Sequence, residues 1–175
     1  MIQAVPDLLT RMAGDATDLI ERRGLEDPLI VGIRTGGVWV AEVLRERLDL
    51  QEPVGIIDIT FYRDDFSRIG LHPQVKPSQL PLSLDDRHII LVDDVLHTGR
   101  TIRAALNEIF DYGRPASVTL AVLVERDGRE LPVEAAIVGQ HADLDARHHV
   151  KLSGPDPLAL SIIEADAFAA GEKTR

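Results

Sequence analysis

Cysteine and membrane-length apolar segments are both missing from this 175-residue sequence. Without cysteine, disulfide bonds, thiolate nucleophiles and Cys-ligated zinc sites are excluded. No apolar run is long enough to span a bilayer, and the first residues lack the basic-then-apolar layout of a secretory signal. We therefore expect a cytoplasmic protein without a membrane partner.

Positive charge is also scarce. The sequence has 19 Lys and Arg against 29 Asp and Glu, a formal net charge of −10. Each contact with a nucleic-acid phosphate needs a cation, so RNA or DNA binding over the whole surface is excluded and any such site must be a local patch. With 45% hydrophobic residues, the chain can build one domain with its own core.

Strand and helix patterns alternate along the chain up to residue 124. Apolar residues at helical spacing predict a first helix that ends at Gly24, where basic residues precede the glycine. The later segments are strands at 29–33, 54–62, 88–95 and 117–124, and helices at 37–50 and 101–113. Because the strands are apolar on both faces, the pattern predicts an α/β protein with a central parallel sheet flanked by helices.

Three segments fall outside this alternation. Residues 63–83 are proline-rich and lack a sustained period, and loops of that length are commonly lids or disordered. Residues 125–154 are predicted to form short strands and turns that make up a small hood. Residues 157–170 are predicted to be a terminal helix.

The segment 89–101, IILVDDVLHTGRT, carries the strongest chemical signal. A buried strand ends in two carboxylates, Asp93 and Asp94, and a glycine loop leads into a helix. That edge of a parallel sheet binds ligands, and a helix start presents N–H groups that suit a phosphate. Two acids beside a phosphate need donors between them, and ribose hydroxyls fit. The segment therefore indicates a sugar phosphate, unless the acids only cap the helix.

The same segment resembles the phosphoribosyl pyrophosphate signature of the type I phosphoribosyltransferases: a hydrophobic strand, two acids, two hydrophobic residues, one variable residue and T-G-x-T. Together with VGIRTGGVWVAEVL, DITFYRDD and GRPASVTLAVLVERDGRELPV, it is similar to the bifunctional family of pyrimidine operon attenuation proteins and uracil phosphoribosyltransferases. The similarity extends to about Gly154.

This resemblance implies a Rossmann-like type I phosphoribosyltransferase fold with a mobile lid over about 63–83 and a small C-terminal hood. It implies that uracil reacts with phosphoribosyl pyrophosphate to give UMP and pyrophosphate, with Mg²⁺ held mainly by the substrate. It also implies a homo-oligomer, either a dimer or a tetramer.

The resemblance and the chemistry of the reaction assign roles to individual residues. Asp93, Asp94 and the lid residue Arg63 are expected to be catalytic, because displacement at the anomeric carbon passes through a cationic state that positioned charges stabilise. The ribose and 5-phosphate are expected at Val95, Leu96, His97, Thr98, Gly99, Arg100 and Thr101, the pyrophosphate at Arg34, Thr35, Gly36 and Gly37, and the base near Arg126 and Glu130.

Several of these assignments have a plainer alternative. Without the family, the loop 34–37 is equally well explained as a glycine turn, and Arg126 and Glu130 as surface residues. Gly36 departs from the basic residue that is common in relatives, and Arg63 is expected to compensate. His97 stands where the hypoxanthine-guanine branch has an acidic catalytic base, which disfavours a purine, although a histidine handles protons near neutral pH. The 6 histidines form no helical ligand pair, so no structural metal is expected.

RNA from a pyrimidine operon leader is the second partner that the resemblance implies. The candidate contacts are Thr10 and Arg11 on the first helix and Arg22 and Arg23 at its end, with further basic residues over 147–151. Gly14, however, stands where relatives have a histidine. Two alternatives stay open: a mainly regulatory nucleotide-sensing RNA-binding protein with weak activity, and a phosphoribosyltransferase for another base. A P-loop nucleotide triphosphatase is excluded because G-x-x-x-x-G-K-[ST] is absent.

Overall fold

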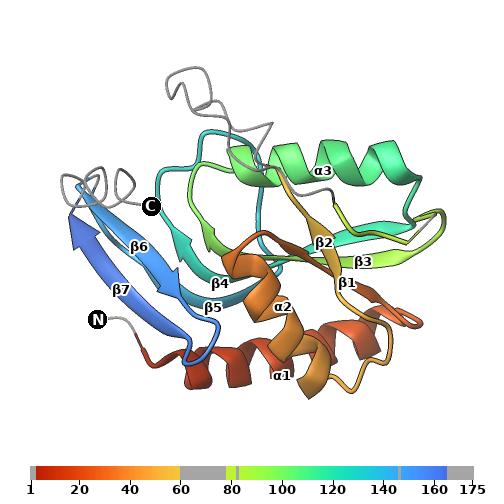
Figure 1. The fold of residues 1–175 in the computed structure, drawn as a ribbon, viewed down its shortest axis with the longest axis horizontal. Helices are drawn as coiled ribbons and strands as arrows, with labels where there is room; N and C mark the ends of the chain where they lie inside the picture. The colour runs from red at the N-terminus through yellow and green to blue at the C-terminus, as the bar shows by residue number, and fades with distance from the viewer. Residues whose placement is uncertain (1–2, 60–77, 82, 146, 165–175) are drawn as a thin grey trace.

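A central sheet of parallel strands organises the computed structural model, which describes residues 3–59, 78–81, 83–145 and 147–164 (Figure 1). The 5-stranded sheet has the order β2-β1-β3-β4-β5, and a separate 2-stranded sheet pairs β6 with β7. The elements in chain order are α1 (Val5–Arg23), β1 (Leu29–Ile33), α2 (Gly36–Arg47), β2 (Gly55–Ile57), β3 (His88–Leu96), α3 (Arg100–Tyr112), β4 (Ser117–Arg126), β5 (Ile137–Ala142), β6 (His148–Ser153) and β7 (Ala159–Glu164).

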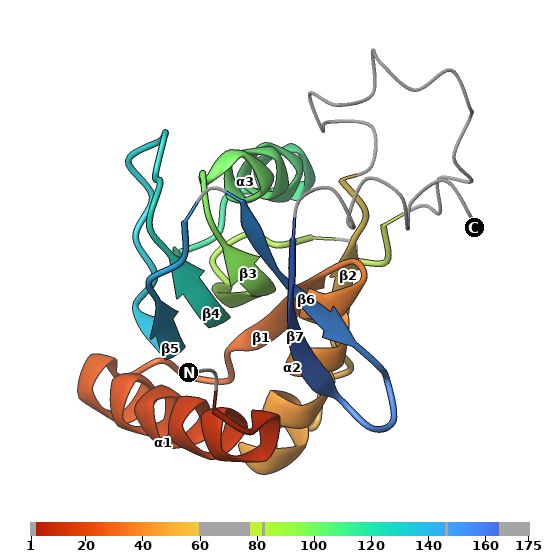
Figure 2. The same ribbon diagram turned by 90° about the vertical axis from the view of Figure 1, so that its left-hand side faces the viewer.

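Helices cover both faces of the sheet, as the all-apolar strands predict. Helices α1 and α2 lie on one face and α3 on the other (Figures 1 and 2). One apolar cluster joins Leu8, Met12 and Leu44 to the first face, and a second joins Ile102 and Ile109 to the opposite face. Full burial of such side chains contributes about 1.5–3 kcal/mol each. This packing holds the carboxyl ends of the strands in a fixed arrangement.

The strand order changes direction between β1 and β3. From β1 the chain passes through α2 to β2 on one side, and β3 then pairs in parallel with the other side of β1. In open parallel sheets, ligands bind in the crevice outside the carboxyl ends of the strands at this reversal. The loop after β1 and the loop after β3 both begin there, so the topology brings the two predicted phosphate loops together.

Helix α1 shows how local signals set the ends of an element. Pro6 and Asp7 stand in its first turn, Arg22 and Arg23 in its last, and Gly24 follows with a φ of 60°. A proline fits a helix start, charges of these signs complement the helix dipole, and glycine readily takes the left-handed conformation. The predicted end of this helix is confirmed. Neither α1 nor any other helix in the described ranges is both long and apolar enough to cross a membrane.

The predicted hood over 125–154 is wrong in part. Within it, β5 pairs in parallel with β4 and so belongs to the central sheet as its edge strand. The small antiparallel sheet is instead formed by β6 and β7, where Leu152 pairs with Leu160 and Val150 with Ile162. These apolar residues, apart from exposed Ile162, join the cluster on the α1 and α2 side, and β6 contacts β3. The small sheet of β6 and β7, which we call the hood from here on, therefore lies beside β3 (Figure 2).

The predicted helix over 157–170 is wrong for Ala159–Glu164, which form β7. Alanine and leucine favour a helix in isolation, but the β-branched Ile162 and Ile163 and the backbone pairing with β6 outweigh that preference. Residues 165–170 lie outside the described part of the chain. So does most of the predicted lid, although Gln79 near its end pairs with Ile56.

Candidate functional site

The loop between β3 and α3 is the predicted site of the 5-phosphate. Gly99 stands at the N-cap of α3 with a φ of 91°, a conformation that glycine adopts at little cost. The side-chain oxygen of Thr98 accepts the N–H of Arg100 at 3.3 Å. The N-cap residue Gly99 has no side chain of its own to cap the helix, and the first turn contains no acid. The helix therefore presents its N-terminal dipole to the crevice with no competing negative charge in that turn.

The acid pair lies within β3 and does not cap the helix, which removes the simplest alternative explanation for it. Asp93 is buried, with 5% of its surface exposed, and its Oδ1 accepts the N–H of Asp94 at 3.0 Å. Asp94 is half-buried. The pair stands at the carboxyl end of the strand, between the two loops, where ribose hydroxyls are suitable donors.

The loop after β1 is packed directly against β3. A Cβ atom on Gly36 would lie 2.5 Å from Oδ2 of Asp94, and one on Gly37 would lie 2.5 Å from the carbonyl oxygen of Val92. The two glycines begin α2, and the Arg34–Thr35 peptide before them is cis. Glycine at position 36 thus leaves space for the Asp94 carboxylate.

Arg34 is held at the same edge by two contacts with the end of β2. Its backbone N–H donates to the carbonyl of Ile57 at 2.9 Å, and its Nε lies 3.5 Å from Oδ2 of Asp58. Asp58 is buried, and its own N–H donates to Ser78 at 3.0 Å. Sequence reasoning missed Asp58. Its position directly after an apolar strand, at the edge where Arg34 also lies, is the signal that identifies it.

Arg126 and Glu130, the two residues predicted near the base, have different surroundings. Arg126 at the end of β4 is buried, and its Nη2 donates to the carbonyl of Asp145 at 3.3 Å. Its buried Nε has no hydrogen-bond partner among the residues that the structure describes. Glu130 is exposed and pairs with Arg100 at 2.7 Å, beside the phosphate loop. Arg126 is therefore the one of the two that offers a buried donor.

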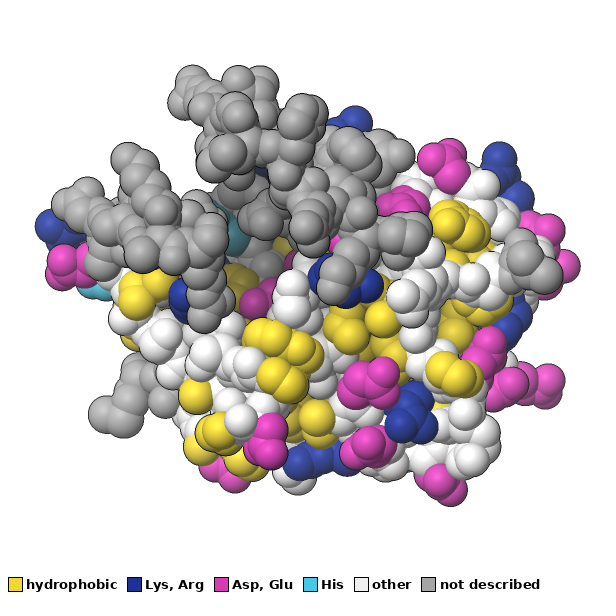
Figure 3. Space-filling model, in the orientation of Figure 1, with side chains coloured by type: hydrophobic (Ala, Val, Ile, Leu, Met, Phe, Trp, Pro, Cys, Tyr) yellow, Lys and Arg dark blue, Asp and Glu magenta, His cyan; other side chains and the backbone are white. Residues whose placement is uncertain are grey.

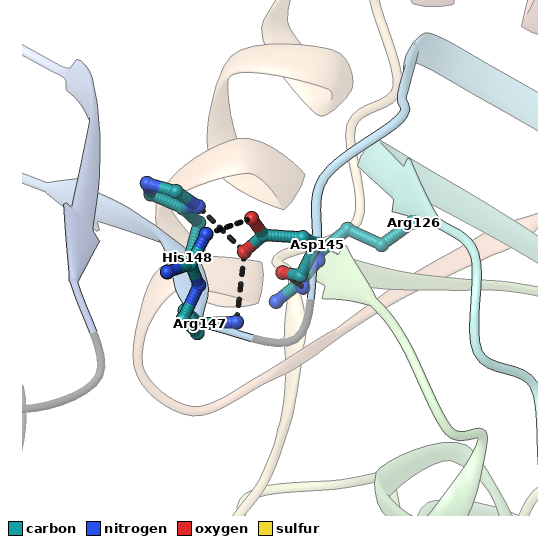
Figure 4. Close-up of polar contacts among 4 residues, drawn as sticks. All are labelled: Arg126, Asp145, Arg147 and His148. Carbon is teal, nitrogen blue, oxygen red and sulfur yellow. Dashed lines mark hydrogen bonds and ion pairs between the residues drawn. The ribbon is translucent and has the colours of Figure 1, made fainter.

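The Asp145 carboxylate turns away from Arg126 toward Arg147 and His148 (Figure 4). His148 contacts it at 2.7 Å, and the backbone N–H of Arg147 donates to it at 2.9 Å. These two hydrogen bonds lower the pKa of Asp145 to about 2. Because the carboxylate is engaged by these neighbours, only the backbone carbonyl of Asp145 is bonded to the Arg126 guanidinium in this cluster.

His97 lies in the phosphate loop, with its ring against Gly128. Burial, followed by electrostatic interaction with Arg126, His149 and Arg129, lowers the pKa of His97 below 6.5. The imidazole is therefore neutral at pH 7 and can accept a hydrogen bond as well as donate one.

The residues predicted to contact RNA lie on the outer surface of α1. Thr10 accepts a hydrogen bond from Arg47 at 2.7 Å, and Arg11 donates to the carbonyl of Gly139 at 2.8 Å. Arg22 and Arg23 are exposed at the end of the helix. On the face shown in Figure 3, acidic and basic side chains are intermixed over the described residues. The same helix also carries four acidic residues, Asp7, Asp15, Asp18 and Glu21.

Other predicted residues fall outside the described ranges or form no cluster. The lid residue Arg63 is among the residues not described. Within the described ranges, no group of three or more His, Asp or Glu side chains is arranged to hold a metal.

Comparison with known proteins places the chain in a family. The model of the phosphoribosyl transferase domain matches residues 1–151. Bifunctional protein PyrR of Nitrosococcus oceani is 64% identical over 152 residues, which are 84% of this chain and 86% of the relative. The Pseudomonas aeruginosa protein of the same name is 58% identical over 154 residues, 88% of this chain and 91% of the relative.

Solved structures agree with the fold. A Trypanosoma cruzi hypoxanthine phosphoribosyl transferase is 21% identical with a TM-score of 0.69, and covers 99% of this chain and 96% of its own. A hypoxanthine-guanine phosphoribosyltransferase of Bacillus anthracis is 16% identical with a TM-score of 0.63, and the match covers 81% of this chain and 82% of that chain. The predicted α/β phosphoribosyltransferase fold is confirmed, and the chain belongs to the phosphoribosyl transferase family and, within it, to the bifunctional PyrR proteins.

Proposed function

We propose that this protein transfers the phosphoribosyl group of phosphoribosyl pyrophosphate to N1 of uracil, and that its second function is to bind RNA in response to the product, UMP. One observation carries the enzymatic half. Two loops suited to phosphates flank Asp93 and Asp94 at the point where the strand order reverses, and a Cβ on Gly36 in the first loop would meet Asp94 at 2.5 Å. A ribose with a phosphate at each end matches this arrangement.

In the proposed reaction, the bond from N1 of uracil to C1′ of the ribose forms as the bond from C1′ to the pyrophosphate oxygen breaks. The N1 proton leaves, and pyrophosphate departs with the electron pair of the broken bond. Positive charge develops on the ribosyl ring along the way, and the carboxylates of Asp93 and Asp94 stabilise it while they accept hydrogen bonds from the ribose hydroxyls. Arg34 stabilises the negative charge on the leaving pyrophosphate.

The base is proposed to lie between the phosphate loop and the hood. The buried Arg126 guanidinium offers a donor to a carbonyl oxygen of uracil, and as negative charge grows on the base while its proton leaves, this cation stabilises it. The neutral His97 imidazole is the nearby group that can accept a proton or a hydrogen bond.

Mg²⁺ fits this site as a companion of the substrate. It prefers octahedral oxygen ligands and commonly takes one or two carboxylates, with substrate phosphates and water completing the shell. Asp94 is half-buried and can contribute one such oxygen. When bound, the ion supplies charge neutralisation for the pyrophosphate.

A screen of bases tests the enzymatic half. With phosphoribosyl pyrophosphate and Mg²⁺, we expect pyrophosphate release with uracil and little with hypoxanthine, guanine or orotate. Release with hypoxanthine or orotate but not with uracil would show that the base is wrong while the phosphoribosyl site is right.

RNA binding is proposed for the α1 surface that carries Thr10, Arg11, Arg22 and Arg23, in line with membership of a family called bifunctional. Titration of pyrimidine leader RNA over a salt series, with and without UMP, tests it, because each phosphate contact adds to the salt dependence of the affinity. We expect UMP to strengthen binding and Arg22→Ala with Arg23→Ala to weaken it. Equal affinity for unrelated RNA under both conditions would refute this half.

A further inference from the structure

We propose that Glu125 and Arg129 act together as positioning residues for the 5-phosphate, by fixing the backbone of the loop that binds it. Neither residue was singled out by its sequence. The inference rests on the proposed placement of the 5-phosphate at the loop 95–101.

Arg129 joins two groups that are distant in sequence. Its Nη1 donates to the carbonyl of His97 in the phosphate loop, and its Nη2 donates to Oε1 of Glu125 at the end of β4. The side chains are shielded, with 23% of Arg129 and 15% of Glu125 exposed. A guanidinium is planar and presents its donors in a fixed fork, so a carboxylate on one nitrogen orients the other. Glu125 therefore aims Arg129 at the loop.

Residues 130 and 131, which follow Arg129, bind the next carbonyl of the phosphate loop, that of Thr98. The backbone N–H groups of Glu130 and Leu131 both donate to the carbonyl of Thr98, at 3.0 and 3.1 Å. A Cβ on Gly99 would be 3.4 Å from side-chain atoms of Leu131 and Val133. Two successive carbonyls, those of His97 and Thr98, are thus held from the same side by residues 129–131.

These contacts have a direct consequence for ligand binding. Cis peptides occur in the described residues only at 34–35, 154–155 and 156–157, so the 97–98 and 98–99 peptides are trans. In a planar trans peptide the N–H points opposite to the C=O. The carbonyls of His97 and Thr98 are held toward residues 129–131. The N–H groups of Thr98 and Gly99 therefore point away from those residues. Those are the donors that an anion at a helix start needs.

The chain offers a matched control for this arrangement. Arg45 near the end of α2 also joins a carboxylate to a backbone carbonyl: its Nη1 donates to Leu50 at 3.1 Å and its Nε to Glu42 at 3.3 Å. Its side chain is 26% exposed, close to the value for Arg129. It braces a turn far from the crevice, so Arg45→Ala removes the same kind of contact without touching the phosphate loop.

The test measures equilibrium binding of ribose 5-phosphate, phosphoribosyl pyrophosphate and inorganic pyrophosphate to the full-length protein. We expect Arg129→Ala to weaken the first two by about tenfold, in the range of couplings between contacting residues. Pyrophosphate binding stays unchanged, because that ligand does not need the loop. Arg129→Lys restores part of the affinity, and Arg45→Ala leaves all three unchanged.

Glu125→Gln keeps the proposal testable if Arg129→Ala folds poorly, since it leaves Arg129 in place but releases its orientation. We expect a loss of about threefold for ribose 5-phosphate, and no further loss when it is combined with Arg129→Ala. Unchanged ribose 5-phosphate affinity in either variant, or an equal loss for pyrophosphate, would overturn the proposal. Thr101→Val distinguishes failure of the positioning role from failure of the proposed 5-phosphate site. If this variant too leaves ribose 5-phosphate binding unchanged, the placement of the 5-phosphate itself is wrong.

Discussion

The loop after β1 and the loop after β3 start from neighbouring strands, and each is suited to a phosphate, but they are held in different ways. The first is fixed by close packing: Gly36 and Gly37 lie against Asp94 and the backbone of Val92. The second is fixed by hydrogen bonds from residues 129–131. Close packing leaves little freedom for a side chain, whereas a hydrogen-bonded loop keeps its donors available for a ligand. The two loops should therefore respond differently to substitution.

Substitution of the acid pair between the loops should have the largest effect on activity, because both loops position the substrate whose ribose contacts these acids. We expect Asp93→Asn and Asp94→Asn each to lower kcat by about 100-fold or more, since each removes a charge that stabilises the cationic ribosyl group. Initial rates of pyrophosphate release measure this, and circular dichroism checks that the fold is kept. A folded variant with a kcat within threefold of wild type would contradict the role given to that acid.

Glycine substitutions compare the two loops directly. In Gly37→Ala the new Cβ would meet the backbone carbonyl of Val92 at 2.5 Å, and a strand in the centre of the sheet cannot easily move. We expect a loss of about 1–3 kcal/mol in the free energy of unfolding. Gly99→Ala meets only side-chain atoms at 3.4 Å but has a φ of 91°, so the expected loss is about 1–2 kcal/mol.

Urea titration of both glycine variants gives these free energies, and ligand binding gives the functional contrast. We expect Gly37→Ala to weaken pyrophosphate more than ribose 5-phosphate, and Gly99→Ala to do the reverse. If both variants weakened both ligands equally, the loops would not be separate binding elements.

Arg34 gives the cation of the first loop, and its removal should affect one ligand only. We expect Arg34→Ala to weaken pyrophosphate and phosphoribosyl pyrophosphate by about tenfold while ribose 5-phosphate is unchanged, because charge-assisted contacts contribute about 1.5–3 kcal/mol. The variant should also lose stability, since buried Asp58 then lacks the Arg34 cation 3.5 Å away. Arg87→Ala, which breaks the pair with Glu52 away from the crevice, controls for loss of an ion pair.

The fold and the position of the acid pair near the end of β3 were predictable because their signals are local. Strands apolar on both faces, the helix end at Gly24, and the segment 89–101 all specify their structure within a few residues. The hood was not predictable in the same way: β5 joins the sheet and β7 replaces a predicted helix because of pairing with partners elsewhere in the chain. Asp58 and Arg129 were missed for a similar reason, since each acts on a residue of another loop.

The second loop contains a titratable side chain, His97, whose pKa is shifted. Its effect on the pH dependence of stability is expected to be small but measurable. The pKa of His97 is lowered in the folded protein, mainly by burial, whereas the unfolded chain takes up the proton near its ordinary value of 6.5. The unfolded state therefore binds more protons below that value, and the stability associated with a neutral His97 is complete above pH 6.5 and falls as the pH drops below it. We expect urea midpoints measured between pH 7.5 and 5.5 to fall less in His97→Asn than in wild type. An identical pH dependence in His97→Asn would show that this ring is not held neutral by its surroundings.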